Sequence, residues 1–245
     1  IGVTGVQTCA LPICSRYWAE FVGAPSSVYN SASTGQDNTD DAAARPLLME
    51  WWDSGGFDLF FSLHSNAGGG TGTESFIYNN GGAIQHSAGL LAQSGAMQSA
   101  IHDQFIADLQ AQYPGWVNRG KKTANFAELR NATTVPSVLL ETAFHDRVAD
   151  AEKLRDPKWR FAAARAIYKG MARAFDPSAV IAPLAPTHLR AINTGTGEVT
   201  IAWRASSDPL EASATPTGYK VYVSRDGFCY DDGTLTATTS LALTG

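Results

Sequence analysis

Apolar residues are arranged differently in different parts of the chain. Short unbroken apolar runs bounded by turn residues occur at Phe57–His64 (FDLFFSLH) and Val135–Leu140 (VPSVLL), and SFIY at 75–78 is a third such segment. Runs of this length are typical of buried strands. Residues 87–112 instead carry apolar side chains at helical spacing, so we expect a long helix that Ser87 caps and Pro114 ends. Strands alternating with long helices predict an α/β domain.

Helices are also expected near both ends of this domain. Residues 15–24 have the pattern of a helix end, and residues 25–30 that of a short extended piece. Asp40 or Asp41 is expected to cap a further helix, which contains Pro46. Asp156 followed by Pro157 is a favourable cap and first-turn pair. It predicts a closing helix with Trp159, Ala163, Ile167 and Met171 on its apolar face.

The pattern changes near residue 177. PSAVIAPLAPT is rich in proline and is typical of a linker. The following segments alternate without helical spacing, as in a small β-sandwich: THLRAI, GEVTIAW and TGYKVYVS. We therefore expect a sheet flanked by helices at 15–177, a linker at 178–186 and a partial β-sandwich at 187–245.

The first 14 residues, IGVTGVQTCALPIC, carry no charge and no helical or strand period. They are similar to the conceptual translation of a common sequencing-adapter oligonucleotide, with the match running to about Ile13. We interpret this segment as an artefact and exclude it from the fold prediction. The alternative is a native strand that ends in a proline turn.

Charge and cysteine content exclude several classes of protein. The 245 residues carry a formal net charge of −5 without a basic block, which is a poor match for a protein that binds nucleic acid. An uninterrupted apolar run of about 18 residues, as a membrane span needs, is absent from the sequence. The three cysteines, Cys9, Cys14 and Cys229, contain neither a CxxC pair nor a disulfide framework.

His64 is the first candidate for chemistry. It ends a predicted strand and precedes the glycine-rich segment SNAGGGTGTE. In α/β sheets ligands bind beyond the carboxyl ends of strands, and a neutral imidazole there can hold zinc. The alternative is a structural histidine satisfied by local hydrogen bonds.

Glu141 is the second candidate, since it follows the apolar run VPSVLL. Burial raises the pKa of such a carboxyl group, and a raised pKa suits a general acid or base. The alternative is a structural ion pair with Arg130 or Arg147. Taken together, a histidine and a glutamate at the ends of buried strands indicate zinc-assisted hydrolysis, with the glutamate activating water.

Two segments also resemble a known family. SLHSNAGGGTGTESFIY resembles the second-histidine motif of the zinc-dependent N-acetylmuramoyl-L-alanine amidases of type 3, roughly SIHANA…GTE, and ELRNATTVPSVLLETAFHD resembles their later motif, roughly VLR…PAVLVELGFLSN. DAEKLRDPKWRFAAARAIYKGMARAF is similar to the closing helix. The segments RYWAEFVGAPSSVYN and SSDPLEASATPTGYKVYVSRDGF resemble a secreted bacterial subgroup that carries a fibronectin type III module. The resemblance covers about residues 15–245.

The resemblance implies a reaction and a cofactor. The family's fold, phosphorylase/hydrolase-like, carries one Zn2+ ion and cleaves the amide bond between N-acetylmuramic acid and L-alanine in peptidoglycan. His64 matches a zinc ligand and Glu141 the catalytic glutamate. Asn66, Glu74 and Arg130 match positions that are structural or line the substrate, and His145 stands where the family motif has drifted, with a surface role as its alternative.

The match is incomplete. The family's first two zinc ligands, a histidine and a glutamate, have no counterpart in this chain, and the resemblance implies that they would lie upstream of Ser15. The surroundings of Glu20 do not fit the ligand motif. We expect His86 and His102 to be solvated on a helix. Since a zinc site needs about three protein ligands, we expect this chain to bind zinc weakly or not at all and to be inactive.

Three functional hypotheses remain. The first is a zinc amidase that acts on peptidoglycan or a related glycan-peptide, outside the cytoplasm by resemblance. The second is a non-catalytic binder of cell wall or polysaccharide on a degenerate scaffold, and the third is a zinc peptidase or another carbohydrate-active enzyme. In the C-terminal module, Trp203 and Tyr219 match fibronectin core aromatics, and its last two strands have no counterpart. An open sheet edge would make that module marginally stable.

Overall fold

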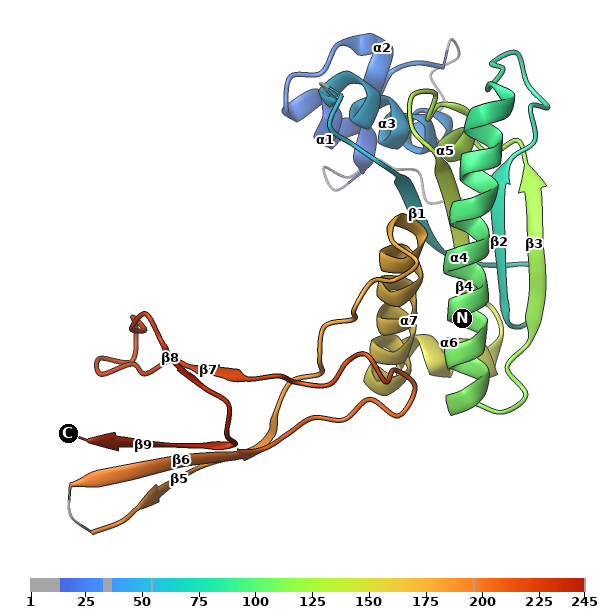
Figure 1. Ribbon diagram of the computed structural model, residues 1–245. Coiled ribbons are helices and arrows are strands. Elements are labelled where there is room, and N and C mark those ends of the chain that lie inside the picture. The colour runs from blue at the N-terminus through green and yellow to red at the C-terminus, as the bar shows by residue number, and fades with distance from the viewer. Residues whose placement is uncertain (1–13, 33–36, 54, 196, 245) are drawn as a thin grey trace. The chain divides into compact units, whose positions relative to one another are not determined.

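The computed structural model describes residues 14–32, 37–53, 55–195 and 197–244, and the chain forms two compact units, Ile1–Pro177 and Ser178–Gly245. Figure 1 shows the elements of both units along the chain. The predicted artefactual segment lies outside the described residues except for Cys14. In the described part of the chain, none of the helices has the length and apolar character of a membrane span.

The first unit is built on a four-stranded sheet. The strand order is β1-β4-β2-β3, and β1 runs parallel to β4, β2 antiparallel to β4, and β2 parallel to β3. The strands are β1 (Phe60–Asn66), β2 (Thr73–Tyr78), β3 (Asn118–Ala124) and β4 (Ser137–Phe144). Among the described strands, β4 lies between β1 and β2, so the strand that carries Glu141 is a direct neighbour of the strand that carries His64.

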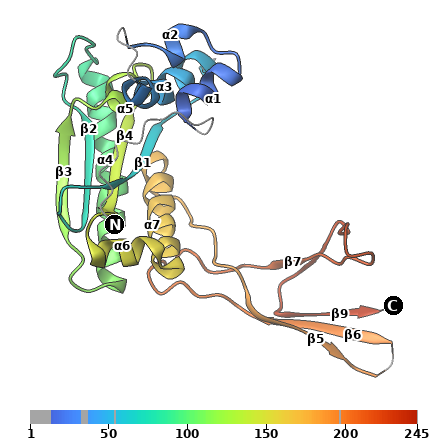
Figure 2. The same ribbon diagram turned by 180° about the vertical axis from the view of Figure 1, so that it is seen from behind.

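Helices cover the sheet (Figures 1 and 2). Helices α4 and α7 pack together on one face, and α3 and α5 lie against each other near one end of β4. The helices are α1 (Ser15–Phe21), α2 (Ser26–Tyr29), α3 (Asp37–Trp52), α4 (Ala88–Gln112), α5 (Ala127–Arg130), α6 (Val148–Arg155) and α7 (Pro157–Phe175). The chain is thus an α/β fold with helices flanking a central sheet, as predicted.

The main core lies between β4 and the helix pair α4/α7. Phe105 and Leu109 of α4 meet Trp159 of α7 and Leu140 of β4, and all four side chains are buried. Gly170 allows the helices to approach closely, since a Cβ there would lie 2.7 Å from the Cα of Ile101. A second cluster, Tyr78, Leu129 and Leu139, joins β2, α5 and β4.

The helix caps predicted at Ser87 and Asp156 are confirmed. The Ser87 hydroxyl accepts a hydrogen bond from the Leu90 N–H at 3.1 Å, and the Asp156 carboxylate accepts one from the Lys158 N–H at 2.9 Å. These bonds satisfy backbone donors that have no partner within the helix. They fix where α4 and α7 begin.

Several local predictions were wrong. Residues 26–29 form one helical turn rather than an extended piece, and α3 starts at Asp37 and continues through Pro46. Asp40 does not cap α3, because its carboxylate accepts a hydrogen bond from the Ala32 N–H at 2.7 Å. Strand β1 is half-exposed rather than fully buried, since it pairs only with β4 among the described strands.

The predicted positions of the two candidate residues on their strands were also wrong. His64 and Glu141 lie inside β1 and β4 rather than at their ends. Strand β3 and helices α5 and α6 were not predicted at all. Strand β3 has the sequence NRGKKTA, which is polar on both faces and therefore lacks the apolar signal of a buried strand.

The second unit contains two small antiparallel sheets, β5-β6-β9 and β7-β8. The strands are β5 (Thr187–Asn193), β6 (Glu198–Arg204), β7 (Tyr219–Val221), β8 (Thr234–Thr236) and β9 (Ser240–Thr244). The rings of Trp203 and Tyr219 make an edge contact with centroids 5.1 Å apart. Strands therefore follow the α/β core, as the alternating pattern predicted.

Candidate active site

A row of charged and polar residues crosses the sheet of the first unit. His64 on β1 pairs with Glu141 on β4, Glu141 lies opposite Glu74 on β2, and Glu74 pairs with Gly120 on β3. Directly paired residues on neighbouring strands project from the same face of a sheet. The sheet therefore brings His64, Glu141 and Glu74 together, although 77 residues separate the first two in the sequence.

His64 is the half-buried end of this row. Its Nε2 atom lies 2.9 Å from the Ser62 hydroxyl and 3.6 Å from Oε1 of Glu128. Burial lowers the pKa of His64, Glu128 opposes this shift, and Arg45 adds to it. The net effect favours the neutral imidazole, which is the form that can ligate a metal ion.

Glu141 is the residue whose acidity the fold changes most clearly. Burial raises its pKa to about 7, with further contributions from the negative charges of Glu74 and Glu128. Its Oε2 atom is buried and has no hydrogen-bond partner among the described residues. Neither Arg130 nor Arg147 forms an ion pair with it in the described part of the chain, which excludes the structural alternative considered from the sequence.

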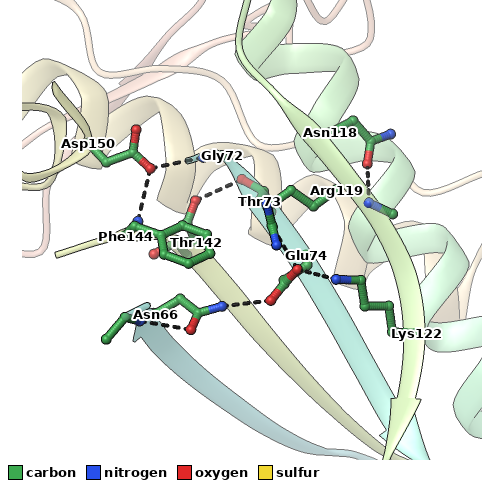
Figure 3. A network of polar contacts seen from close by, with 12 residues as sticks. Asn66, Gly72, Thr73, Glu74, Asn118, Arg119, Lys122, Thr142, Phe144 and Asp150 are labelled. Atoms are coloured by element: carbon green, nitrogen blue, oxygen red, sulfur yellow. Dashed lines mark hydrogen bonds and ion pairs between the residues drawn. The ribbon is translucent and has the colours of Figure 1, made fainter. Parts of the chain in front are cut away.

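Glu74 has the opposite environment (Figure 3). Its buried carboxylate accepts hydrogen bonds from Asn66 Nδ2 at 2.6 Å, from Arg119 Nε at 2.8 Å and from Lys122 Nζ. Burial by itself would raise the pKa of Glu74, but the bonds from Lys122 and Arg119 outweigh it and the pKa is lowered. Glu74 is therefore an anion, and two cations from β3 hold it in place.

Glu128 and Arg45 were not predicted as site residues. Oε1 of the buried Glu128 accepts a hydrogen bond from Nη1 of Arg45 at 3.1 Å, and Nη2 of Arg45 donates to Asp41 at 2.7 Å. These bonds connect α3 to α5 beside His64. No local sequence signal indicates them, because Arg45 and Glu128 are 83 residues apart.

The loop after β1 is held at its base by an aspartate (Figure 3). The Asp150 carboxylate accepts hydrogen bonds from the Gly72 N–H at 2.9 Å, from the Phe144 N–H at 2.9 Å and from the Thr71 hydroxyl at 2.6 Å. This buried carboxylate fixes the glycine-rich loop against the end of β4.

The remaining predicted residues lie around this row. His145 is exposed, with Nδ1 3.1 Å from the Ser65 hydroxyl. The guanidinium of Arg130 donates to Asn125 Oδ1 at 2.7 Å, and this bond links the end of α5 to the segment that precedes it.

His86 and His102 are buried rather than solvated, which corrects the prediction. His102 lies 2.9 Å from both the Ser75 hydroxyl and Asn118 Oδ1, and His86 Nε2 lies 3.1 Å from the carbonyl oxygen of Arg130. Helical periodicity places a histidine on a polar face, but it cannot show that distant chain segments supply hydrogen-bond partners there.

The donors present do not complete a zinc site. The unpartnered Glu141 oxygen and the neutral His64 would suit a nearby cation. However, no group of three or more His, Cys, Asp or Glu side chains that could hold a metal ion occurs in the described ranges. A structural or catalytic zinc ion needs about three protein ligands. We therefore derive no reaction step through the metal.

Comparison with known proteins identifies the family. The type 3 amidase family, described as N-acetylmuramoyl-L-alanine amidase, matches residues 32–173. This chain belongs to that family. The chain is 34% identical over 191 residues to the N-acetylmuramoyl-L-alanine amidase CwlM of Bacillus licheniformis. It is also 34% identical over 164 residues to the sporulation-specific N-acetylmuramoyl-L-alanine amidase of Bacillus subtilis.

Coverage differs between this amidase-family chain and its relatives. The alignments include 78% and 67% of the chain, and the chain spans 65% and 55% of the lengths of the two relatives. Among solved structures, the catalytic domain of CwlV from Bacillus (Paenibacillus) polymyxa is 23% identical, with a TM-score of 0.43, and the match covers 53% of this chain and 64% of that one. The CwlD amidase of Clostridioides difficile is 21% identical, with a TM-score of 0.46 and coverages of 67% and 82%.

Proposed function

We propose that the protein is a peptidoglycan amidase that cleaves the bond between N-acetylmuramic acid and L-alanine. The observation that carries this proposal is the pairing of His64 with Glu141, whose carboxyl group has a pKa near 7. Membership of the family and the names of the relatives support the substrate class. Because the substrate is cell wall, we also propose that the protein acts outside the cytoplasm, secreted or at the cell envelope.

Glu141 is the proposed general base. A carboxyl group with a pKa near 7 is partly deprotonated at neutral pH, so it can accept a proton from water and return it to the leaving amine. Its unpartnered Oε2 atom is free of competing hydrogen bonds in the described chain. The partly buried position keeps the carboxylate reactive, since fewer water molecules solvate its charge.

We propose that His64 would be one ligand of a zinc ion, which would supply the polarisation of the amide when bound. The described residues do not offer a full ligand set. We therefore propose that the described residues by themselves bind zinc weakly or not at all, and that the chain is inactive unless further ligands complete the zinc site. Atomic absorption on the purified, dialysed chain should find well below one zinc ion per molecule, and one tightly held ion would overturn this proposal.

Supporting roles follow from the contacts around the row. Asn66 and Glu74 are proposed to shape the substrate-facing floor of the site, since the Asn66 amide donates to the Glu74 carboxylate. Arg130 is proposed to be structural, because it holds the segment before α5. His145 is exposed at the rim and is proposed to contact substrate, with a plain surface role as the alternative.

The C-terminal unit is proposed to be a partial fibronectin type III module that serves attachment or spacing.

A turnover assay tests the role proposed for Glu141. In a protein whose zinc ligands are complete, Glu141→Gln should lower the release of peptide from purified cell walls by a factor of about 100 or more. Ser87→Ala, which removes only a helix cap, serves as the matched control and should leave release unchanged. Undiminished release by Glu141→Gln would refute the assigned role.

The incomplete ligand set favours a second candidate function. A chain that recognises cell wall without cutting it would keep the amidase fold and lack a complete set of metal ligands. Co-sedimentation with insoluble peptidoglycan distinguishes the two functions. Binding without release of peptide, even at millimolar zinc, would support the non-catalytic binder over the amidase.

A further inference from the structure

Two cations lie beside the active-site row on the edge strand β3. The side chains of Arg119 and Lys122 are 35% and 38% exposed, and both reach the Glu74 carboxylate, which is only 7% exposed. Two positive charges therefore share one negative charge. Arg119, Lys122 and Glu74 together keep one net positive charge at the surface.

Two donor groups of Arg119 have no partner among the described residues. Its Nε atom donates to Glu74, its guanidinium carbon lies 4.9 Å from the centre of the Phe144 ring, and its two Nη groups make no hydrogen bond with any described residue. Stacking on an aromatic ring orients the planar guanidinium group. A guanidinium held in this way presents paired N–H donors, which is the geometry that binds a carboxylate.

The position of this pair fits one part of the proposed substrate. Neighbouring strands lie about 4.8 Å apart, so β3 is roughly 10 Å from β4, two strands away. An extended peptide advances about 3.5 Å per residue. A peptide that ran across the strands from a scissile amide at Glu141 would bring its second residue and the side group of that residue to β3.

We propose that Arg119 and Lys122 bind the free carboxylate of the second residue of the stem peptide. This inference rests on the proposed function and names the part of the substrate that the site recognises. Peptidoglycan stems carry at this residue either a free carboxylate or its amide. The cation pair then makes the protein prefer the unamidated stem.

Binding of two matched ligands tests the proposal with the full chain and a chelator present. N-acetylmuramoyl-L-alanyl-D-glutamate carries the carboxylate, and N-acetylmuramoyl-L-alanyl-D-isoglutamine carries the amide in its place. In NMR titrations the first ligand should bind about 5–10-fold more tightly, as a charge-assisted hydrogen bond allows. Arg119→Gln with Lys122→Gln should reduce this ratio to about 1.

Lys121→Gln is the matched control. Lys121 lies on the same strand but its Nζ atom donates to Asp103 on α4 at 2.8 Å, so this substitution removes one positive charge from β3 away from Glu74. It should leave the ratio unchanged. Arg119→Lys, which keeps the charge, should retain part of the preference and guards against a loss caused by misfolding.

The outcomes separate the two proposals. Equal affinity of the natural chain for both ligands overturns the inference and leaves the amidase proposal standing. A preference that survives the double substitution assigns the carboxylate to other residues and also overturns it. Absence of binding by either ligand contradicts the proposed function itself.

Discussion

Glu74 and Glu141 lie directly opposite each other on β2 and β4, yet their carboxyl groups are shifted in opposite directions. Glu74 receives hydrogen bonds from two cations, so its pKa is lowered despite its burial. Glu141 has no such partner, and burial raises its pKa to about 7. Two neighbouring carboxyl groups are thus divided into a fixed anion and a group that exchanges protons near neutral pH.

The first prediction concerns stability and pH in the metal-free protein. The folded-state pKa of Glu141, about 7, exceeds its ordinary value of 4.5, so the folded chain binds this proton more tightly than the unfolded chain. The free energy of unfolding should therefore fall as pH rises between about 4.5 and 7. Glu141→Gln should remove this loss and make the protein more stable above pH 7 by about 1–2 kcal/mol, allowing for solvent screening.

Urea unfolding of both proteins at pH 4.5 and pH 8 in EDTA measures this effect. The two proteins should differ little at pH 4.5, where Glu141 is protonated in the folded chain. A difference in unfolding free energy that stays constant across the pH range would show that Glu141 is not the titrating group.

The second prediction concerns the pKa of His64. Glu128 raises this pKa and Arg45 lowers it, against the larger lowering by burial. Glu128→Gln should therefore lower the His64 pKa further, and Arg45→Met should raise it. NMR titration of the His64 ring protons follows both shifts. Lys121→Met provides a control that removes a cation elsewhere, and an equal shift with this variant would mean a general charge effect.

The third prediction concerns the buried ion pair between α4 and α7. Nζ of Lys169 lies 2.7 Å from Oδ2 of Asp108, and the lysine side chain is fully buried. Lys169→Met leaves a buried carboxylate without this cation, so it should destabilise the fold by about 3 kcal/mol. The double variant Asp108→Leu with Lys169→Met should recover most of that loss in urea unfolding. A double variant as unstable as the single one would show that the pair itself stabilises the fold.

The fourth prediction concerns the glycine-rich loop. Asp150 accepts two backbone N–H bonds, from Gly72 and Phe144, so Asp150→Ala should cost about 2 kcal/mol and speed amide exchange at both positions. Asp103→Ala removes an exposed carboxylate and should change stability by less than about 0.5 kcal/mol. Unaltered exchange at Gly72 in Asp150→Ala would mean that the loop is held by other contacts.

Features set by nearby residues could be predicted from the sequence. The caps at Ser87 and Asp156 depend on residues only two or three positions away, so α4 and α7 start where the sequence indicates. The apolar runs around His64 and Glu141 located two strands, although not their ends. Strand limits depend on pairing with other strands, which a single segment does not show.

Features set by distant partners could not be predicted. Arg119 meets Glu74 from 45 positions away, and His102 is buried because Ser75, 27 positions away, supplies a hydrogen bond. The sequence NRGKKTA lacks the apolar pattern of a buried strand. Its pairing with β2 makes it a strand, and this strand carries Arg119 and Lys122. His64 and Glu141 were candidates from their places beside apolar runs and from the resemblance to the amidases, whereas the cations near them became apparent only from the fold.

The row from His64 to Gly120 is spaced by the ladder of backbone hydrogen bonds, not by loops. Lengthening the glycine-rich loop would therefore leave the spacing of these groups intact. A single residue inserted in β4 ahead of Glu141 would instead turn that side chain towards α4 and α7, where Leu140 now packs. The register of β4 therefore constrains the site more strictly than the length of the loop does.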